Sequence, residues 1–186
     1  METNDIDLDL DIFSNTKHYE KCKKEQAERN KKYYLKNKED LQKKQTIYKN
    51  KMRKTDVKFN VSSKMANRLR NILKKDGIKK TCKTFGILGY PKQHLIKRLR
   101  KSLTELNRIS EAKYTWRHFL NAELHIDHIL PISKFNYKST DDEAFKLCWS
   151  LENLQLLPAK ENLEKRDKCE NFEEKYQELK LKVSGF

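Results

Sequence analysis

Three polar residues that could do hydrolytic chemistry stand together in the segment 125–132, which reads HIDHILPI. The segment is strand-like, and neighbours in a strand point to opposite faces unless the strand bends. Asp127 could therefore face a divalent metal ion while His128 faces an attacking water, because an imidazole that titrates near neutral pH suits a general base. His125 shares the strand face of Asp127, so it could contact a phosphate or act as a hydrogen-bonded partner. This pattern favours metal-assisted hydrolysis of a phosphodiester.

A second strand and a helix must bring further ligands to these residues. The segment 152–158 reads ENLQLLP and predicts a strand, and the segment 159–168 predicts the start of a helix. Asn162 could supply an amide oxygen from that helix, and Lys165, one turn later, could reach a phosphate. One carboxylate and one amide oxygen form a hard, sparse ligand set, which suits Mg²⁺, with Mn²⁺ as a substitute.

The order strand, strand, helix, with Asp-His, Asn-Leu-Gln and Asn-x-x-Lys in turn, resembles the HNH endonucleases, which have the ββα-metal fold. The resemblance covers about residues 62–168 and is close to a group common in phages and large viruses. It implies that Asp127 and Asn162 bind the metal and that His128 is the general base. It also implies that Asn153 pins the hairpin by backbone hydrogen bonds, and that the products carry 5′-phosphate and 3′-hydroxyl ends.

The chain departs from that group mainly in its packing residues. Leu124 and Leu156 stand where the group often has Trp and Pro. Many relatives hold a zinc ion with CxxC pairs, but Pro158 and Glu161 occupy the places of one such pair, so we expect no structural zinc. Aromatic side chains are expected to hold the hairpin instead, namely Trp116, Phe135, Phe145 and Trp149.

Charge is distributed unevenly along the 186 residues. Charged residues make up 37% of the chain, and the net charge is +15. Residues 1–16 carry −5, residues 17–58 carry +10, residues 64–101 carry +12, and residues 102–186 carry −2. A strongly basic half that precedes a near-neutral half predicts a nucleic-acid partner, with binding and chemistry separated along the chain.

Several classes of protein are not expected from this sequence. No apolar run approaches the roughly 18–20 residues that a membrane span needs, and the acidic start is unlike a signal peptide. The cysteines form no CxxC pair, and a disulfide framework is not expected without secretion. We therefore expect an intracellular, reduced protein, in the host cytoplasm or nucleus if it is viral, with no membrane partner.

The first 58 residues predict a tail followed by a long helix. Residues 1–16 alternate acidic and apolar side chains, which is typical of a disordered tail or of a segment that competes with nucleic acid for the basic region. Residues 17–58 contain neither Gly nor Pro, and Tyr19, Tyr34 and Tyr48 would share one stripe of a continuous helix. That helix could lie on DNA, with lysines on the backbone and rings on bases, or be merely solvated.

Residues 59–110 predict two basic amphipathic helices. Ser62 or Ser63 could cap the first helix, with Gly77 as its stop, and Pro91 suits the first turn of the second. Their basic residues, with two from the preceding helix, are the candidate nucleic-acid contacts: Arg68, Arg70, Lys74, Lys75, Lys92, Lys97, Arg98, Lys101, Tyr34 and Lys36.

The expected architecture is an α+β chain in which a ββα-metal (HNH) core with a C-terminal helix, residues 111–186, follows a mostly helical, lysine-rich extension. The expected function is a Mg²⁺-dependent DNA endonuclease that acts on duplex DNA. Two alternatives remain open, namely a catalytically silent nucleic-acid-binding or packaging protein and a nuclease that acts on RNA. Nothing in the sequence indicates an oligomer.

Overall fold

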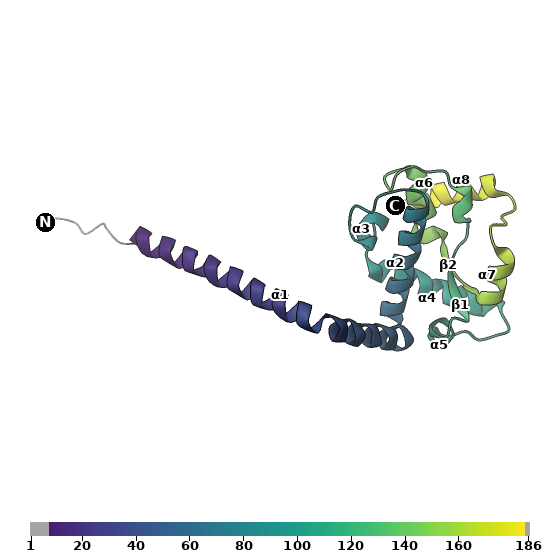
Figure 1. Ribbon diagram of the computed structural model, residues 1–186. Helices are drawn as coiled ribbons and strands as arrows, with labels where there is room; N and C mark the ends of the chain where they lie inside the picture. Colours follow the sequence, from purple (N-terminus) through teal and green to yellow (C-terminus); the bar gives the residue numbers. More distant parts are fainter. Residues whose placement is uncertain (1–7, 185–186) are drawn as a thin grey trace. The chain divides into compact units, whose positions relative to one another are not determined.

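The computed structural model describes residues 8–184, and it describes side-chain surroundings from residue 16 on. The chain divides into two compact units, residues 1–50 and 51–186 (Figure 1). Residues 1–7 of the expected acidic tail lie outside the described part. Helix α1 (Leu8–Thr55) begins inside the segment 1–16 that was expected to be a tail.

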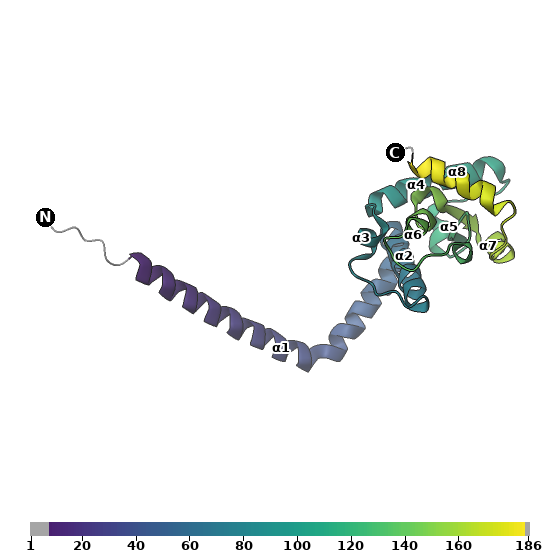
Figure 2. The same cartoon turned by 90° about the horizontal axis from the view of Figure 1, so that it is seen from above.

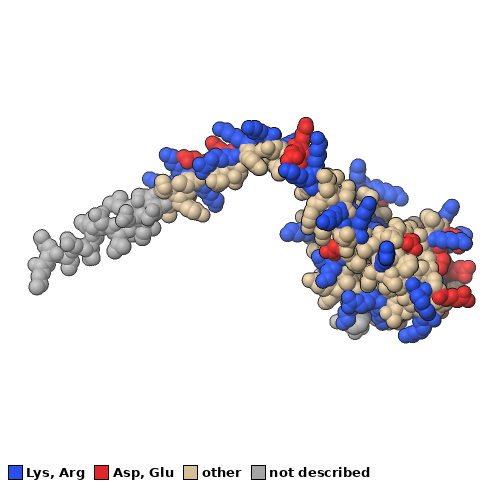
Figure 3. Space-filling view, turned by 90° about the horizontal axis from the view of Figure 1, so that it is seen from below, with Lys and Arg blue, Asp and Glu red and all other residues tan. Residues whose placement is uncertain are grey.

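Helix α1 makes up the described part of the first unit and continues a few residues into the second. Its side chains are almost all exposed, including Tyr19, Tyr34 and Tyr48. Where the side chains of α1 are described, lysine and arginine side chains are interspersed with fewer acidic ones (Figure 3). An exposed helix with a thin apolar stripe and many cations gains little from packing, so its charge is available to a polyanion.

Helix α2 (Val57–Lys75) begins earlier than the sequence predicted. The N-cap is Asp56, whose carboxylate accepts a hydrogen bond from the Phe59 amide at 2.9 Å. The expected cap at Ser62 or Ser63 is therefore wrong; the Ser62 hydroxyl instead donates to the Lys58 carbonyl inside the helix. An aspartate at this position satisfies an otherwise unpaired helix amide and precedes the first apolar residues of the buried face. Gly77, with φ +68°, lies just past the helix end, as expected.

Three further helices precede the sheet: α3 (Thr84–Leu88), α4 (Lys92–Ile109) and α5 (Trp116–Leu120). Pro91 lies immediately before the first turn of α4. The leucines of α4 recur at helical spacing and are buried, namely Leu95, Leu99, Leu103 and Leu106. Each buried leucine contributes about 1.5–3 kcal/mol relative to exposure, so this stripe holds α4 against the rest of the second unit.

The sheet consists of two antiparallel strands, β1 (Leu124–His128) and β2 (Leu154–Pro158), in which Ile126 lies opposite Leu156. Between them run the short helices η1 (Ile132–Lys134), α6 (Glu143–Cys148) and η2 (Leu151–Asn153). The second strand is thus shorter than expected, because its first residues form a 3₁₀ turn. Helices α7 (Ala159–Lys165) and α8 (Phe172–Ser184) complete the described chain.

Both edges of this small sheet are closed by side chains from neighbouring helices. Arg68 on α2 donates to the Ile126 carbonyl at 2.8 Å, and the Leu156 amide donates to the Ser102 hydroxyl on α4 at 2.8 Å. An isolated two-stranded sheet is marginal in water and exposes unpaired backbone groups at its edges. Helices α2 and α4 therefore stabilise the hairpin by hydrogen bonding as well as by packing.

Aromatic side chains fill the core around the hairpin, as expected for three of the four residues. Phe135, Phe145 and Trp149 are buried, whereas Trp116 is half-buried at the edge of the core, against Phe119. Helix α8 lies along one side of the second unit (Figure 2), where Phe172 and Tyr176 contact the ring of Phe135. The chain is of the α+β class. No helix in the described part is both long and apolar enough to cross a membrane.

Candidate active site at the hairpin and helix α7

Asp127 lies at the centre of a buried polar cluster on β1. Its side chain is nearly inaccessible, and its Oδ2 accepts hydrogen bonds from Lys165 Nζ at 2.5 Å and from Gln155 Nε2 at 3.1 Å. Gln155 is directly opposite Asp127 in the sheet register, and Lys165 comes from the last turn of α7. Lys165 Nζ also donates to the His128 carbonyl. The ion pair offsets the cost of burying the carboxylate.

A second contact joins the same strand to the same helix. Asn162 Nδ2 lies 3.0 Å from His125 Nδ1, so the amide can donate to a neutral imidazole. His125 and Asp127 share a strand face, and Asn162 precedes Lys165 by one helical turn. The expected ligands Asp127 and Asn162 therefore both lie at the contact between β1 and α7. Each is hydrogen-bonded there to a different residue.

By their chemical type, the carboxylate of Asp127 and the amide oxygen of Asn162 suit a hard divalent cation. Asp127 supplies a carboxylate, and Asn162 uses its amide nitrogen on His125, which leaves its oxygen for another partner. The Lys165 ammonium already occupies one carboxylate oxygen, so a bound metal would share or displace that contact. No group of three or more His, Cys, Asp or Glu side chains suited to a metal occurs within the described residues. A site built from one carboxylate and one amide would not form such a group.

His128 points into the core and not toward solvent water, contrary to expectation. Its imidazole is 1% exposed, and neither ring nitrogen has a hydrogen-bond partner among the described residues. Trp149 lies edge-on to it, with ring centroids 4.9 Å apart. Burial, followed by the positive charges of Arg68 and Lys165, holds the pKa of His128 well below its usual value. The ring is therefore neutral at physiological pH, and its lone pair is unused by the protein.

Two cations flank the Asp127–His128 pair from different helices. Lys165 approaches from α7, and Arg68 approaches from α2, where it is half-buried beside β1. We expected Arg68 to be one of several surface contacts to nucleic acid; the structure places it at the hairpin instead. From the sequence we missed Gln155, which donates to Asp127. The pairing of Gln155 with Asp127 depends on the register between the two strands. Alternation along the predicted second strand does not give that register, so the sequence alone could not place Gln155 beside Asp127.

Asn153 ties the hairpin to the loop after β1. It is fully buried, its Oδ1 accepts from the Leu130 amide at 2.7 Å, and its Nδ2 donates to the carbonyls of Leu130 and Cys148. Its own carbonyl accepts from the Ile129 amide at 2.8 Å. These backbone contacts are of the kind that we expected for this residue. They hold the turn that follows His128 at a fixed distance from β2.

The remaining candidate contacts to nucleic acid fall into two groups. Arg98 donates to the Leu151 carbonyl and pairs with Glu105, so it supports the packing of α4, while Lys92 is half-buried. The others are exposed side chains of α1, α2 and α4: Tyr34, Lys36, Arg70, Lys74, Lys75, Lys97 and Lys101. Among the described residues of α2 and α4, the side chains of Arg70 and Lys101 form polar contacts only with neighbours on their own helices, Asn67 and Glu105.

Comparison with known proteins adds no relative: no family model matches the chain, and no curated protein or solved structure is significantly similar to it.

Proposed function

We propose that this protein is a divalent-metal-dependent DNA endonuclease with a ββα-metal core. One observation carries the proposal: at the contact between β1 and α7, Lys165 pairs with Asp127 and Asn162 pairs with His125, beside a neutral His128 with no protein partner among the described residues. A buried polar group without a partner costs about 1–3 kcal/mol, and strongly shifted pKa values such as the lowered pKa of His128 cluster at functional sites. The resemblance to HNH endonucleases implies that Asp127 and Asn162 bind the metal and that His128 is the general base.

Each residue has a distinct part in the proposed hydrolysis. One ring nitrogen of His128 takes the proton of the attacking water, which requires that water reach this buried ring when substrate is bound. Asp127 and Asn162 would hold Mg²⁺, which would stabilise negative charge on the phosphoryl oxygens and the departing 3′-oxygen. Lys165, which contacts Asp127, adds positive charge beside the reacting phosphate. The products would carry 5′-phosphate and 3′-hydroxyl ends.

A catalytically silent nucleic-acid-binding protein is the second candidate, and the burial of His128 favours it. An imidazole that packs against Trp149 and never meets water would be a structural residue. The basic segments 17–58 and 64–101 would then account for the whole function. The two candidates predict different responses to metal.

We expect supercoiled plasmid to be nicked at low salt with Mg²⁺ or Mn²⁺, and not with EDTA, because the proposed hydrolysis depends on a metal ion to stabilise charge on the phosphate. Asp127→Asn should remove the activity. Glu164→Gln, which changes an exposed carboxylate on the same helix α7, should retain it. RNA of matching sequence serves as the competing substrate. Binding without cleavage in either metal, by folded wild-type protein, would favour the silent candidate.

The lysines of α1 should govern the salt dependence of DNA binding. Replacing Lys31, Lys36 and Lys43 together by glutamine should reduce the slope of log K against log salt by about 0.9 for each phosphate that the variant no longer neutralises. The matched control replaces three exposed lysines of the second unit, Lys138, Lys168 and Lys175. Gel-shift titrations at several salt concentrations measure both slopes. Equal slopes for the two triple variants would show that α1 does not contact DNA.

A further inference from the structure

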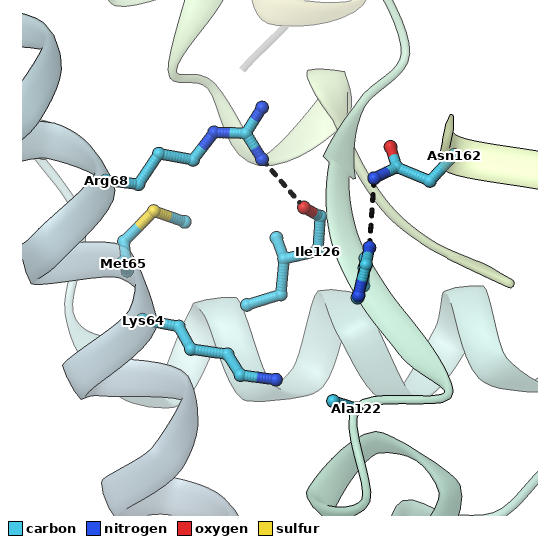
Figure 4. A pocket seen from close by; sticks show the side chains of 7 residues that line it. Lys64, Met65, Arg68, Ala122, Ile126 and Asn162 are labelled. Atoms are coloured by element: carbon cyan, nitrogen blue, oxygen red, sulfur yellow. Dashed lines mark hydrogen bonds between the residues drawn. The ribbon is translucent and has the colours of Figure 1, made fainter. Parts of the chain in front are cut away.

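A small cavity lies between helix α2 and strand β1, beside the proposed active site (Figure 4). Its volume is about 260 Å³. Four polar side chains line it: Lys64 and Arg68 from α2, His125 from β1, and Asn162 from α7. The other three lining residues are apolar, and none of the seven is acidic. The cavity therefore offers cations and hydrogen-bond donors, with no carboxylate in its lining to compete for them.

Contacts to neutral groups, and not ion pairs, hold the two cations of this cavity in place. Lys64 and Arg68 are one turn apart on α2, and Figure 4 shows both side chains extending from the helix toward β1. Arg68 donates one N–H to the Ile126 carbonyl, and Lys64 lies over the Phe119 ring, 4.2 Å from its centroid. Neither forms an ion pair within the described part of the chain. The cavity lining thus contains two positive charges without a direct ion-pair partner within the described residues, and Asp127 lies close enough to Arg68 to favour its charged form.

The electrostatics of the lining favour an anion. Burial lowers the pKa of Lys64, so its charge is costly where it stands. Two like charges that line one half-enclosed space repel each other, and a negative group that enters this space relieves the repulsion. An arginine fork and a lysine ammonium together suit the tetrahedral oxygens of a phosphate.

We propose that this cavity is a subsite for a backbone phosphate of the nucleic-acid substrate, with Lys64 and Arg68 as its main ligands. The inference rests on the proposed function, because Asn162 lines the cavity and also belongs to the proposed metal site. A phosphate held there is the neighbour of the one that is cut. The subsite would fix the position of the bound DNA strand relative to the proposed metal ligands Asp127 and Asn162.

The test measures binding of thymidine 3′,5′-bisphosphate in EDTA, by calorimetry, so that no cleavage is needed. Lys64→Gln and Arg68→Gln should each weaken binding about tenfold or more, because each removes a charge-assisted contact. Lys64→Arg should restore most of the affinity. Arg108→Gln, which changes an exposed arginine in the last turn of α4, is the matched control and should bind like wild type. Inorganic phosphate should bind more weakly than the nucleotide.

Several outcomes would overturn the subsite. They are no nucleotide binding by wild type, unchanged nucleotide binding in Lys64→Gln, or inorganic phosphate binding as tightly as the nucleotide. Arg68→Gln also loses the bond to Ile126, so Lys64→Gln decides the result if the arginine variant does not fold. Nicking by wild type with unchanged nucleotide binding in Lys64→Gln would reject the subsite and keep the nuclease. No nicking by wild type, together with weakened nucleotide binding in Lys64→Gln, would keep the subsite and reject the nuclease.

Discussion

Replacing His128 with asparagine is expected to slow plasmid nicking about 100- to 10,000-fold, which is the usual contribution of a positioned general base. Asparagine keeps a polar side chain in the place of the imidazole but cannot accept a proton at neutral pH. DNA binding should persist, because the ring is buried and does not contribute to the exposed basic surface. The measurement is the nicking rate with saturating Mg²⁺, alongside a gel-shift titration.

Two further variants separate a chemical role of His128 from a packing role. His94→Asn changes an exposed histidine on α4 and should leave the nicking rate unchanged. His128→Ala leaves a cavity beside Trp149, so added imidazole should restore part of its nicking. A nicking rate for His128→Asn close to that of wild type would show that His128 is a structural residue. The silent, nucleic-acid-binding candidate would then be preferred for the hairpin.

Replacing Asn153 with alanine is expected to lower the free energy of unfolding by about 3 kcal/mol or more. The change leaves the Leu130 amide and two carbonyls without their side-chain partner in the buried interior. Urea denaturation, followed by tryptophan fluorescence, measures the loss. Because the loop after His128 is then released from β2, nicking should fall as well, even at temperatures where the variant remains folded.

The matched control for Asn153 is Asn67→Ala, which removes an exposed asparagine on α2 that accepts a hydrogen bond from Arg70. It should change the free energy of unfolding by no more than about 0.5 kcal/mol. Asn153→Asp is informative too, because it keeps an acceptor for the Leu130 amide but loses the two donated bonds. A loss for Asn153→Ala as small as that for Asn67→Ala would contradict the proposed pinning role.

Local spacing was sufficient to predict much of the backbone. The leucines of α4 recur at helical intervals, and these positions are buried because one helix face must leave water. The absence of Gly and Pro predicted a long helix, and α1 extends without a break to Thr55. The predicted order of strand, strand and helix is also observed in β1, β2 and α7, although the boundaries differ by a few residues. The N-cap of α2 was missed, because two serines gave a plausible but incorrect start at Ser62.

The sequence by itself determined which polar residues lie on the two strands and the helix, because alternation and helical period act over a few neighbours. Only the tertiary structure decided their partners. Arg68 reaches Ile126 across 58 positions, and Lys165 reaches Asp127 across 38. The burial of His128 depends on Trp149, which packs against it from another segment. Such contacts depend on how whole elements pack, and no local pattern encodes the distance between two side chains that far apart in the chain.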